Sequence, residues 1–199
     1  MYYVGGVLGM RNTHKPEHLK ADSERRVLPP GAMSLEQFRT KCVACGLCVS
    51  VCKGRALVHS WGELGVDGVF LPMMDYTRGF CQYDCVACVE VCPTHAIEPM
   101  TLKEKQRLRL GIGGYDPRRC RAFTGEDPCG KCAEACPVKA ITMVDFKGKK
   151  IPCFDDSLCI GCGACQYACP VEPRTMAVIP AAYQIPLQSA QDDEKENLT

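Results

Sequence analysis

The chain has 199 residues, a formal net charge of +1 and few aromatic side chains: six Phe, seven Tyr and one Trp. The nearly neutral charge excludes a global electrostatic field suited to nucleic acid or to an acidic substrate. No apolar run approaches the roughly 18 residues that a membrane-spanning helix needs. Seventeen cysteines in a chain with so little aromatic core indicate a scaffold stapled by covalent or inorganic groups.

Residues 1–33 are predicted to form an extended N-terminal arm, because Pro29-Pro30 and Gly31 interrupt regular structure. The apolar run Met1–Met10 is either a strand or docking segment, or the remnant of an export signal or membrane anchor. Arg25-Arg26 is not interpreted as a twin-arginine signal, because two prolines follow it instead of an apolar segment.

Two capping boxes predict short helices. Ser34, with Gln37 three residues later, begins a helix that runs to about Lys41, just before the first cysteine. Thr101, followed by Glu104, begins a second helix, which is predicted to end at Gly111.

Short strands are expected between the cysteine groups, at Val69–Met73 and Ile141–Phe146. Lys147-Gly148 is predicted to form the hairpin turn that follows the second of these strands. The segment Gly111–Gly114 is too short for a dinucleotide-binding fingerprint and is interpreted as a flexible turn. Residues 181–199 form a C-terminal tail, whose polar end is expected to be disordered unless a partner holds it.

Sixteen of the cysteines fall into four groups. The groups are Cys42, Cys45, Cys48 and Cys52; Cys81, Cys85, Cys88 and Cys92; Cys120, Cys129, Cys132 and Cys136; and Cys159, Cys162, Cys165 and Cys169. The first and last match the bacterial ferredoxin spacing C-x2-C-x2-C-x3-C, whose thiolates bind 4Fe–4S clusters. A tight loop with this spacing places three thiolates on one cluster, while its backbone N–H groups offset the negative charge. The sequence therefore predicts four 4Fe–4S clusters.

The groups also repeat as whole units. Their first cysteines recur every 39 residues, and the first three groups share a tail in which a small residue, Ala56, Ala96 or Ala140, precedes Leu or Ile. Such a tail suits a residue packed against a cluster at the start of a strand. This pattern indicates an internal repeat of one cluster-binding unit.

Other uses of these cysteines fit the spacing less well. Structural zinc favours two separated pairs of ligands, and runs of cysteines at i, i+3 and i+6 do not suit one tetrahedral ion. Disulfides are disfavoured because the thiols are too crowded locally for well-formed bridges. Cys153 lies outside every group and is interpreted as a small buried hydrophobic residue, with a substitute ligand or redox thiol as the alternative. His59 and His95 are expected to pack or to lie at the surface.

Residues 103–121 contain seven basic and two acidic side chains. They are interpreted as a solvated helix face and loop, with a docking surface for an acidic redox partner as the alternative.

The four groups, the lead-in Leu28–Ala32 and the stretch Leu108–Ile112 resemble the NapG/MauM type of four-cluster ferredoxin-like protein. These proteins are the electron-transfer subunits of periplasmic nitrate reductase and methylamine-oxidation systems. The resemblance implies an α+β fold with little regular secondary structure, built from two nested ferredoxin-like modules in a domain spanning 34–180. Residues 34–60 with 150–180 would form one module, and residues 65–148 the other.

The resemblance also implies which cysteines share a cluster. The expected sets are Cys42, Cys45, Cys48 with Cys169; Cys159, Cys162, Cys165 with Cys52; Cys81, Cys85, Cys88 with Cys136; and Cys120, Cys129, Cys132 with Cys92. The first group would thus exchange its last cysteine with the fourth group, and the second group with the third.

The implied function is electron transfer without catalysis, and the sequence contains no nucleophile–base set. Single electrons would pass between a membrane-bound quinol-oxidising or multihaem partner and a terminal oxidoreductase. The alternatives are a tightly bound iron–sulfur subunit of a molybdenum, tungsten or other oxidoreductase, and a redox sensor with structural clusters. The resemblance implies a peripheral protein at the periplasmic face of the membrane, and the lack of an evident export signal leaves the cytoplasm open.

Overall fold

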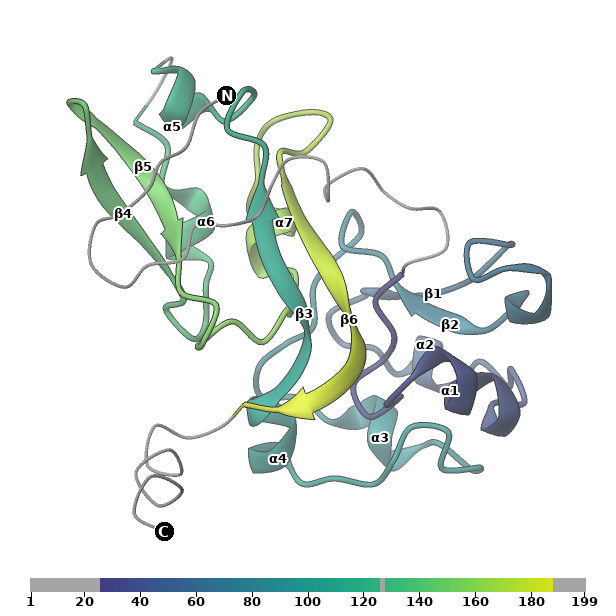
Figure 1. Ribbon diagram of the computed structural model, residues 1–199. Coiled ribbons are helices and arrows are strands. Elements are labelled where there is room, and N and C mark those ends of the chain that lie inside the picture. The colour runs from purple at the N-terminus through teal and green to yellow at the C-terminus, as the bar shows by residue number, and fades with distance from the viewer. Residues whose placement is uncertain (1–25, 126–127, 188–199) are drawn as a thin grey trace, which may run out of the picture.

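The computed structural model describes residues 26–125 and 128–187, and its helices and strands are short (Figure 1). The helices are α1 (Leu35–Lys41), α2 (Leu47–Ser50), α3 (Ala87–Glu90), α4 (Leu102–Arg107), α5 (Arg121–Thr124), α6 (Lys131–Glu134) and α7 (Ala164–Ala168), with a 3-10 turn at Val66–Gly68. The strands are β1 (Leu57–His59), β2 (Pro72–Met74), β3 (Leu108–Tyr115), β4 (Ile141–Phe146), β5 (Lys149–Phe154) and β6 (Met176–Pro186). None of the helices in the described ranges is long and apolar enough to cross a membrane.

A long antiparallel ribbon of β3 and β6 runs through the middle of the molecule, with a lobe on each side (Figure 1). The N-terminal lobe contains α1, α2, α3 and the hairpin β1–β2, and the C-terminal lobe contains α5, α6, α7 and the hairpin β4–β5. The buried apolar residues fall into two clusters, one mainly from residues 27–110 and one from residues 115–176. The mixed content of helix and strand agrees with the predicted α+β class.

The structure shows one half of the capping box predicted for α1. The Ser34 hydroxyl accepts a hydrogen bond from the backbone N–H of Gln37 at 3.2 Å, and the helix ends at Lys41. The next residue, Cys42, donates its backbone N–H to the carbonyl of Phe38 at 2.9 Å. Because Phe38 is almost fully buried, the helix is anchored in the N-terminal lobe and delivers the first cysteine group from a fixed position.

The second predicted helix begins as expected, because Thr101 and Glu104 form both halves of a capping box. The prediction that it runs to Gly111 is wrong: α4 ends at Arg107, and β3 begins at the next residue. The prediction of a flexible turn at Gly111–Gly114 is also wrong, since these residues pair with β6. A Cβ atom on Gly111 would lie 2.4 Å from the Ile179 carbonyl oxygen, so the glycine is needed for close backbone contact.

The hairpin β4–β5 matches its prediction, with the first strand at Ile141–Phe146. Lys147 and Gly148 both have positive φ, 49° and 77°, as the two central residues of a type I′ turn require. The strand predicted at Val69–Met73 is displaced, because β2 begins only at Pro72. Phe70 has φ 65° and belongs to the loop of the β1–β2 hairpin.

Candidate iron–sulfur sites

The loops that carry the first and fourth groups have the same backbone conformation. Ala44 and Gly46 have φ of 52° and 74°, and Gly161 and Gly163, at the same offsets from the first cysteine, have 71° and 80°. Alternating positive and negative φ curls the chain into a tight loop that turns successive N–H groups to one side. Short helices, α2 and α7, then carry the third cysteine of each group.

The tails of the first three groups repeat as well. Arg55, His95 and Lys139, each three residues after the last cysteine of its group, have φ of 52°, 52° and 55°. The alanines that follow, Ala56, Ala96 and Ala140, are at most 4% exposed. A larger side chain would not fit at these positions without moving the loops. The internal repeat predicted from the sequence is therefore confirmed in the backbone.

The structure gathers the sixteen grouped cysteines into four sets, each with three cysteines of one group and the last cysteine of another. Site 1 contains Cys42, Cys45, Cys48 and Cys92; site 2 contains Cys81, Cys85, Cys88 and Cys52; site 3 contains Cys120, Cys129, Cys132 and Cys169; and site 4 contains Cys159, Cys162, Cys165 and Cys136. Sites 1 and 3 each line a surface hollow, of about 330 and 320 Å³ including its open mouth.

The expected pairing of the groups is wrong. Cys92, not Cys169, lies with the first group, and Cys169 lies with the third. Likewise, Cys52 lies with the second group and Cys136 with the fourth. The last cysteine is exchanged between groups 1 and 2 and between groups 3 and 4, so the two modules follow each other along the chain instead of being nested.

The hairpins explain this consecutive pairing. In the first module Asp75 donates its N–H to the carbonyl of Ala56 at 2.7 Å, and in the second Asp155 donates to Ala140 at 2.8 Å. Each bond closes a hairpin between two successive groups and returns the chain to the cluster site that it left. Consecutive elements usually pack together because short connections close at lower entropic cost than long ones.

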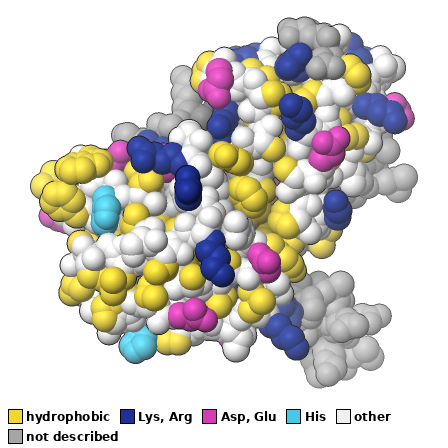
Figure 2. Space-filling view, turned by 180° about the vertical axis from the view of Figure 1, so that it is seen from behind, with side chains coloured by type: hydrophobic (Ala, Val, Ile, Leu, Met, Phe, Trp, Pro, Cys, Tyr) yellow, Lys and Arg dark blue, Asp and Glu magenta, His cyan; other side chains and the backbone are white. Residues whose placement is uncertain are grey.

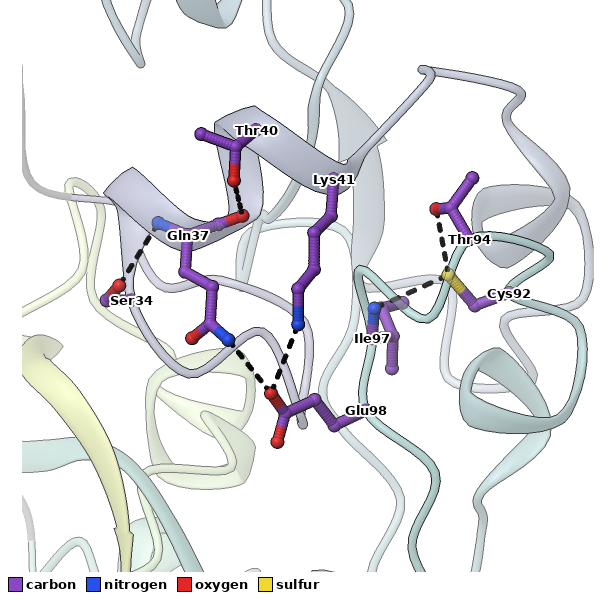
Figure 3. A network of polar contacts seen from close by, with 8 residues as sticks. All are labelled: Ser34, Gln37, Thr40, Lys41, Cys92, Thr94, Ile97 and Glu98. Atoms are coloured by element: carbon purple, nitrogen blue, oxygen red, sulfur yellow. Dashed lines mark hydrogen bonds and ion pairs between the residues drawn. The ribbon is translucent and has the colours of Figure 1, made fainter.

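Polar contacts of Glu98 tie the segment that follows Cys92 to α1 (Figure 3). One carboxylate oxygen of Glu98 accepts a hydrogen bond from the Gln37 side chain at 3.0 Å and pairs with Lys41 at 3.5 Å. Both partners lie on α1, directly before Cys42. The network therefore connects the segment after Cys92 to the helix that delivers the first thiol of site 1.

Hydrogen bonds to sulfur occur at several sites. Backbone N–H groups of Ala44, Ile97 and Gly113 donate to Cys42, Cys92 and Cys159 at 3.3–3.4 Å. Such N–H···S contacts stabilise the negative charge of thiolates and of the clusters that they bind.

Cys169 shows the strongest such environment. Burial acts to raise the pKa of this thiol, but hydrogen bonds from the Thr175 hydroxyl and from three backbone N–H groups outweigh it, so the pKa lies below its usual value. The thiolate form, which is the form that binds metal, is therefore favoured at Cys169.

Other thiols are buried too deeply to ionise alone. Burial, reinforced by neighbouring thiols, raises the pKa of Cys48, Cys88, Cys132 and Cys162 to about 12. Binding of iron at these positions must therefore release protons, because metal ligands are deprotonated.

The four sets fit polynuclear clusters better than single ions. Within the described ranges, no three His, Cys, Asp or Glu side chains are grouped closely enough to hold one metal ion. A structural zinc needs its sulfurs about 2.3 Å from one centre. A set of four neighbouring thiols matches the four cysteine ligands of a 4Fe–4S cluster, and N–H groups donate to the sulfurs of Cys42, Cys92 and Cys159.

Successive sites are neighbours in space in the order 1, 2, 4, 3. The thiol of Cys48, in site 1, lies close enough to that of Cys88, in site 2, to raise its pKa. The backbone N–H of Cys81 in site 2 donates to the Cys162 carbonyl in site 4 at 2.9 Å. Cys132 of site 3 is close to Cys165 of site 4. The outer sites are therefore 1 and 3, and Cys81–Cys162 joins the two lobes.

The remaining predicted residues have other roles. Cys153 is buried in β5, opposite Thr142, as predicted for a small apolar residue. His59 contacts the Phe70 carbonyl at 3.0 Å, and His95 is exposed. The basic segment 103–121 is not one solvated face, because Lys105 is buried. Met1–Met10 and residues 191–197 lie outside the described residues.

No sequence motif indicated a role for Tyr76. This fully buried ring lies between sites 2 and 4, and its hydroxyl donates to the Gly161 carbonyl at 2.8 Å. A Cβ atom on Gly163 would lie 2.2 Å from the ring, so Gly163 leaves room for it. The residue has no motif of its own, and only the packing of the two modules brings it to the junction.

Comparison with known proteins agrees with this geometry. Residues 127–172 match a 4Fe-4S dicluster domain, which covers most of the third group and all of the fourth, and residues 37–58 match a 4Fe-4S binding domain that covers the first group.

Curated relatives include the methylamine utilization ferredoxin-type protein MauM of Methylobacillus flagellatus, 31% identical over 67% of this chain and 59% of that protein. MauM of Methylophilus methylotrophus is 29% identical over 82% of this chain and 74% of its own length. The ferredoxin-type protein NapF of Escherichia coli K12 is 28% identical over 68% of this chain and 74% of its own length. The match thus spans about three fifths of the first of these relatives. With its 4Fe–4S domains and these homologues, the chain is a ferredoxin-type iron–sulfur electron-transfer protein that is similar to MauM and NapF.

Proposed function

We propose that the protein holds four 4Fe–4S clusters, one at each of sites 1–4, and passes single electrons along the order 1, 2, 4, 3. The observation that supports this proposal is the direct contact between the lobes. In this contact the backbone N–H of Cys81, in site 2, donates a hydrogen bond to the carbonyl of Cys162, in site 4. All sixteen grouped cysteines are ligands in this proposal, and Cys153 is not.

The clusters, when bound, supply the one-electron chemistry. The residues of the chain fix the position of each cluster and set its potential through hydrogen bonds to sulfur, burial and nearby charge. No catalytic residue is required. The buried Tyr76 ring excludes water from the space between sites 2 and 4.

Of the two outer sites, 1 and 3, site 1 is the more accessible to a redox partner. Cys45 is exposed, and Val43 and Leu47 beside it are 64% and 46% exposed. Hydrophobic side chains gather over the lobe that contains β1 and β2, on the left in Figure 2. An apolar surface around an exposed ligand suits a redox partner that must approach closely, because electron transfer falls steeply with distance.

The proposed partners are a membrane-bound quinol-oxidising or multihaem protein on one side and a terminal oxidoreductase on the other. The names of the MauM relatives, which place them in methylamine utilization, support an oxidoreductase as the terminal partner. The location proposed from the family resemblance is the periplasmic face of the membrane, as a peripheral protein. Co-purification with a large oxidoreductase subunit through a high-salt wash would instead favour a permanent subunit of that enzyme.

The experiment is a reductive titration of the anaerobically purified protein, monitored by electron paramagnetic resonance. The content of iron and acid-labile sulfide per chain is measured on the same sample. Iron and sulfide for four clusters are expected, with magnetic coupling between sites 1 and 2, 2 and 4, and 4 and 3. Fewer clusters, or zinc in place of iron, would contradict the cluster assignment. Coupling between sites 1 and 3 without coupling between sites 2 and 4 would contradict the proposed order.

A further inference from the structure

Lys105 is a buried cation beside site 2. It lies on α4, its side chain is only 3% exposed, and its ammonium group donates to the carbonyl oxygens of Gln82 and Tyr83, the second at 3.3 Å. These carbonyls belong to the two residues that directly follow Cys81. The other charged side chains of α4 are exposed, so Lys105 is the one that the fold turns inward.

The ammonium group also reaches a cluster ligand. Burial raises the pKa of the Cys81 thiol, and the nearby positive charge of Lys105 opposes this effect. None of the ion pairs within the described ranges includes Lys105. A buried ammonium is costly without an anionic partner, and a cluster bound beside Cys81 would supply that negative charge.

A cluster bound at site 2 gains one negative charge when it is reduced. A fixed positive charge in a poorly solvated region stabilises the reduced form more than the oxidised form, because Coulomb attraction is stronger where water is excluded. An opposite charge within about 4–6 Å changes the ionisation equilibrium of a group by about one to three powers of ten, and the same attraction acts on an added electron.

We propose that Lys105 raises the reduction potential of the cluster at site 2 and so holds the transferred electron on the site 2 side of the junction between the lobes. The inference rests on the proposed four-cluster function. The step adds one electron to the iron of this cluster, supplied by the cluster of a neighbouring site or by a chemical reductant. No bond forms or breaks, and the ammonium keeps its protons.

The position of site 2 gives this charge a consequence for the whole chain of clusters. Site 2 contacts site 4 through the hydrogen bond from the backbone N–H of Cys81 to the carbonyl of Cys162. Lys105 therefore acts on the cluster that the electron occupies directly before or after it crosses between the lobes. It is a positioning and potential-setting residue, not a catalytic one.

The test uses the full chain in four variants. K105Q and K105M remove the charge, K105R keeps it, and K103Q removes a charge from an exposed position on the same helix. A redox titration followed by paramagnetic resonance should show one potential lowered in K105Q and K105M by about 59 mV or more, equivalent to a tenfold or larger change in the one-electron equilibrium. K105R and K103Q should keep all four potentials of the unmodified protein.

Unchanged potentials in a fully loaded K105Q would overturn the inference while leaving the four-cluster function intact. A lack of clusters in the unmodified protein would instead overturn the function. A second measurement does not depend on the folding of any variant. In the unmodified protein labelled with lysine that carries 15N at the side-chain nitrogen, pulsed paramagnetic resonance should detect this nitrogen coupled to one reduced cluster. No such coupling at any cluster would also overturn the inference.

Discussion

The last cysteine of each group lies in a different cluster site from the three that precede it. Cys92 illustrates the cause: it follows α3, but its sulfur faces the first group, where it accepts the Ile97 N–H at 3.4 Å. The three residues after it lead to His95 at positive φ and then to the buried Ala96, which turns the chain away. The same local geometry recurs after Cys52 and Cys136, so the exchange is a property of the repeated loop.

A double-variant experiment tests which cysteines share a site. Cys45→Ser and Cys92→Ser are each expected to lose or alter the cluster of site 1, because serine is a poorer ligand for iron. Since both residues belong to site 1, the double variant C45S/C92S should lose no more iron than either single variant. C45S/C169S should lose the iron of two clusters, measured as iron and acid-labile sulfide per chain.

The control for this experiment is Cys153→Ala, which should retain the full iron content because Cys153 lies in the β4–β5 hairpin. Loss of only one cluster in C45S/C169S would show that Cys45 and Cys169 share a site, as the nested pairing requires. Loss of a cluster in C153A would show that this cysteine is a ligand after all.

At the scale of elements, the ribbon of β3 and β6 depends on glycine. Gly111 lies opposite Pro180, and its missing side chain leaves room for the Ile179 carbonyl. Gly161, in the loop of the fourth group, would place a Cβ 2.4 Å from the Gly111 backbone nitrogen. The strand thus contacts both its partner strand and a cluster loop at backbone distance, which is why a glycine-rich segment forms a strand here.

Substitution of Gly111 by alanine should destabilise the protein. The added methyl group would meet backbone atoms at 2.4 Å, which cannot move as a side chain can, so an overpacking cost of about 1–3 kcal/mol is expected. The readout is the temperature at which the visible absorbance of the clusters is lost, which should fall in G111A.

Gly130→Ala is the matched control, because its nearest neighbour is a flexible Met143 side chain at 3.8 Å. It should change the free energy of unfolding by no more than about 0.5 kcal/mol, the usual range for substitutions that disturb no special feature, so its transition temperature should stay close to that of the unmodified protein. An equal loss in both variants would argue against close packing between β3 and β6.

At the scale of the whole molecule, Gln184 connects the end of the described chain to its beginning. Its side-chain oxygen accepts the Gly31 N–H at 2.8 Å, and its side-chain nitrogen donates to the carbonyls of Pro29 and Leu28 at 2.8 and 3.3 Å. The residue is only 2% exposed. The lead-in before α1 is therefore held by a strand more than 150 residues later, instead of extending freely as an arm.

Replacement of Gln184 by leucine should cost about 3 kcal/mol, because it leaves one buried N–H and two buried carbonyls without their partner. The expected result is a lower cluster-loss temperature and faster proteolysis of the N-terminal segment. Gln106→Leu is the control, since that side chain makes one weak contact at 3.5 Å and should have little effect. Equal stability of Q184L and Q106L would contradict this role for Gln184.

Local chemistry made a large part of this structure predictable. The caps at Ser34 and Thr101, the strand Ile141–Phe146 and the turn at Lys147-Gly148 each depend on residues within one turn or hairpin, and the structure confirms all of them. The end of α4 at Arg107 was not predictable in this way, because pairing with a strand distant in sequence decides it.

The sequence by itself determined the chemistry: cysteines at fixed short spacings form cluster-binding loops, and their repeat, including the small buried alanines, is a local property of the chain. Only the tertiary structure decided which groups exchange a cysteine, in what order the sites lie, and which cation reaches a site. The physical reason is that hairpin closure, strand pairing and burial join residues far apart in sequence. Cys92, Cys162 and Lys105 therefore acquire their neighbours only when the lobes have packed.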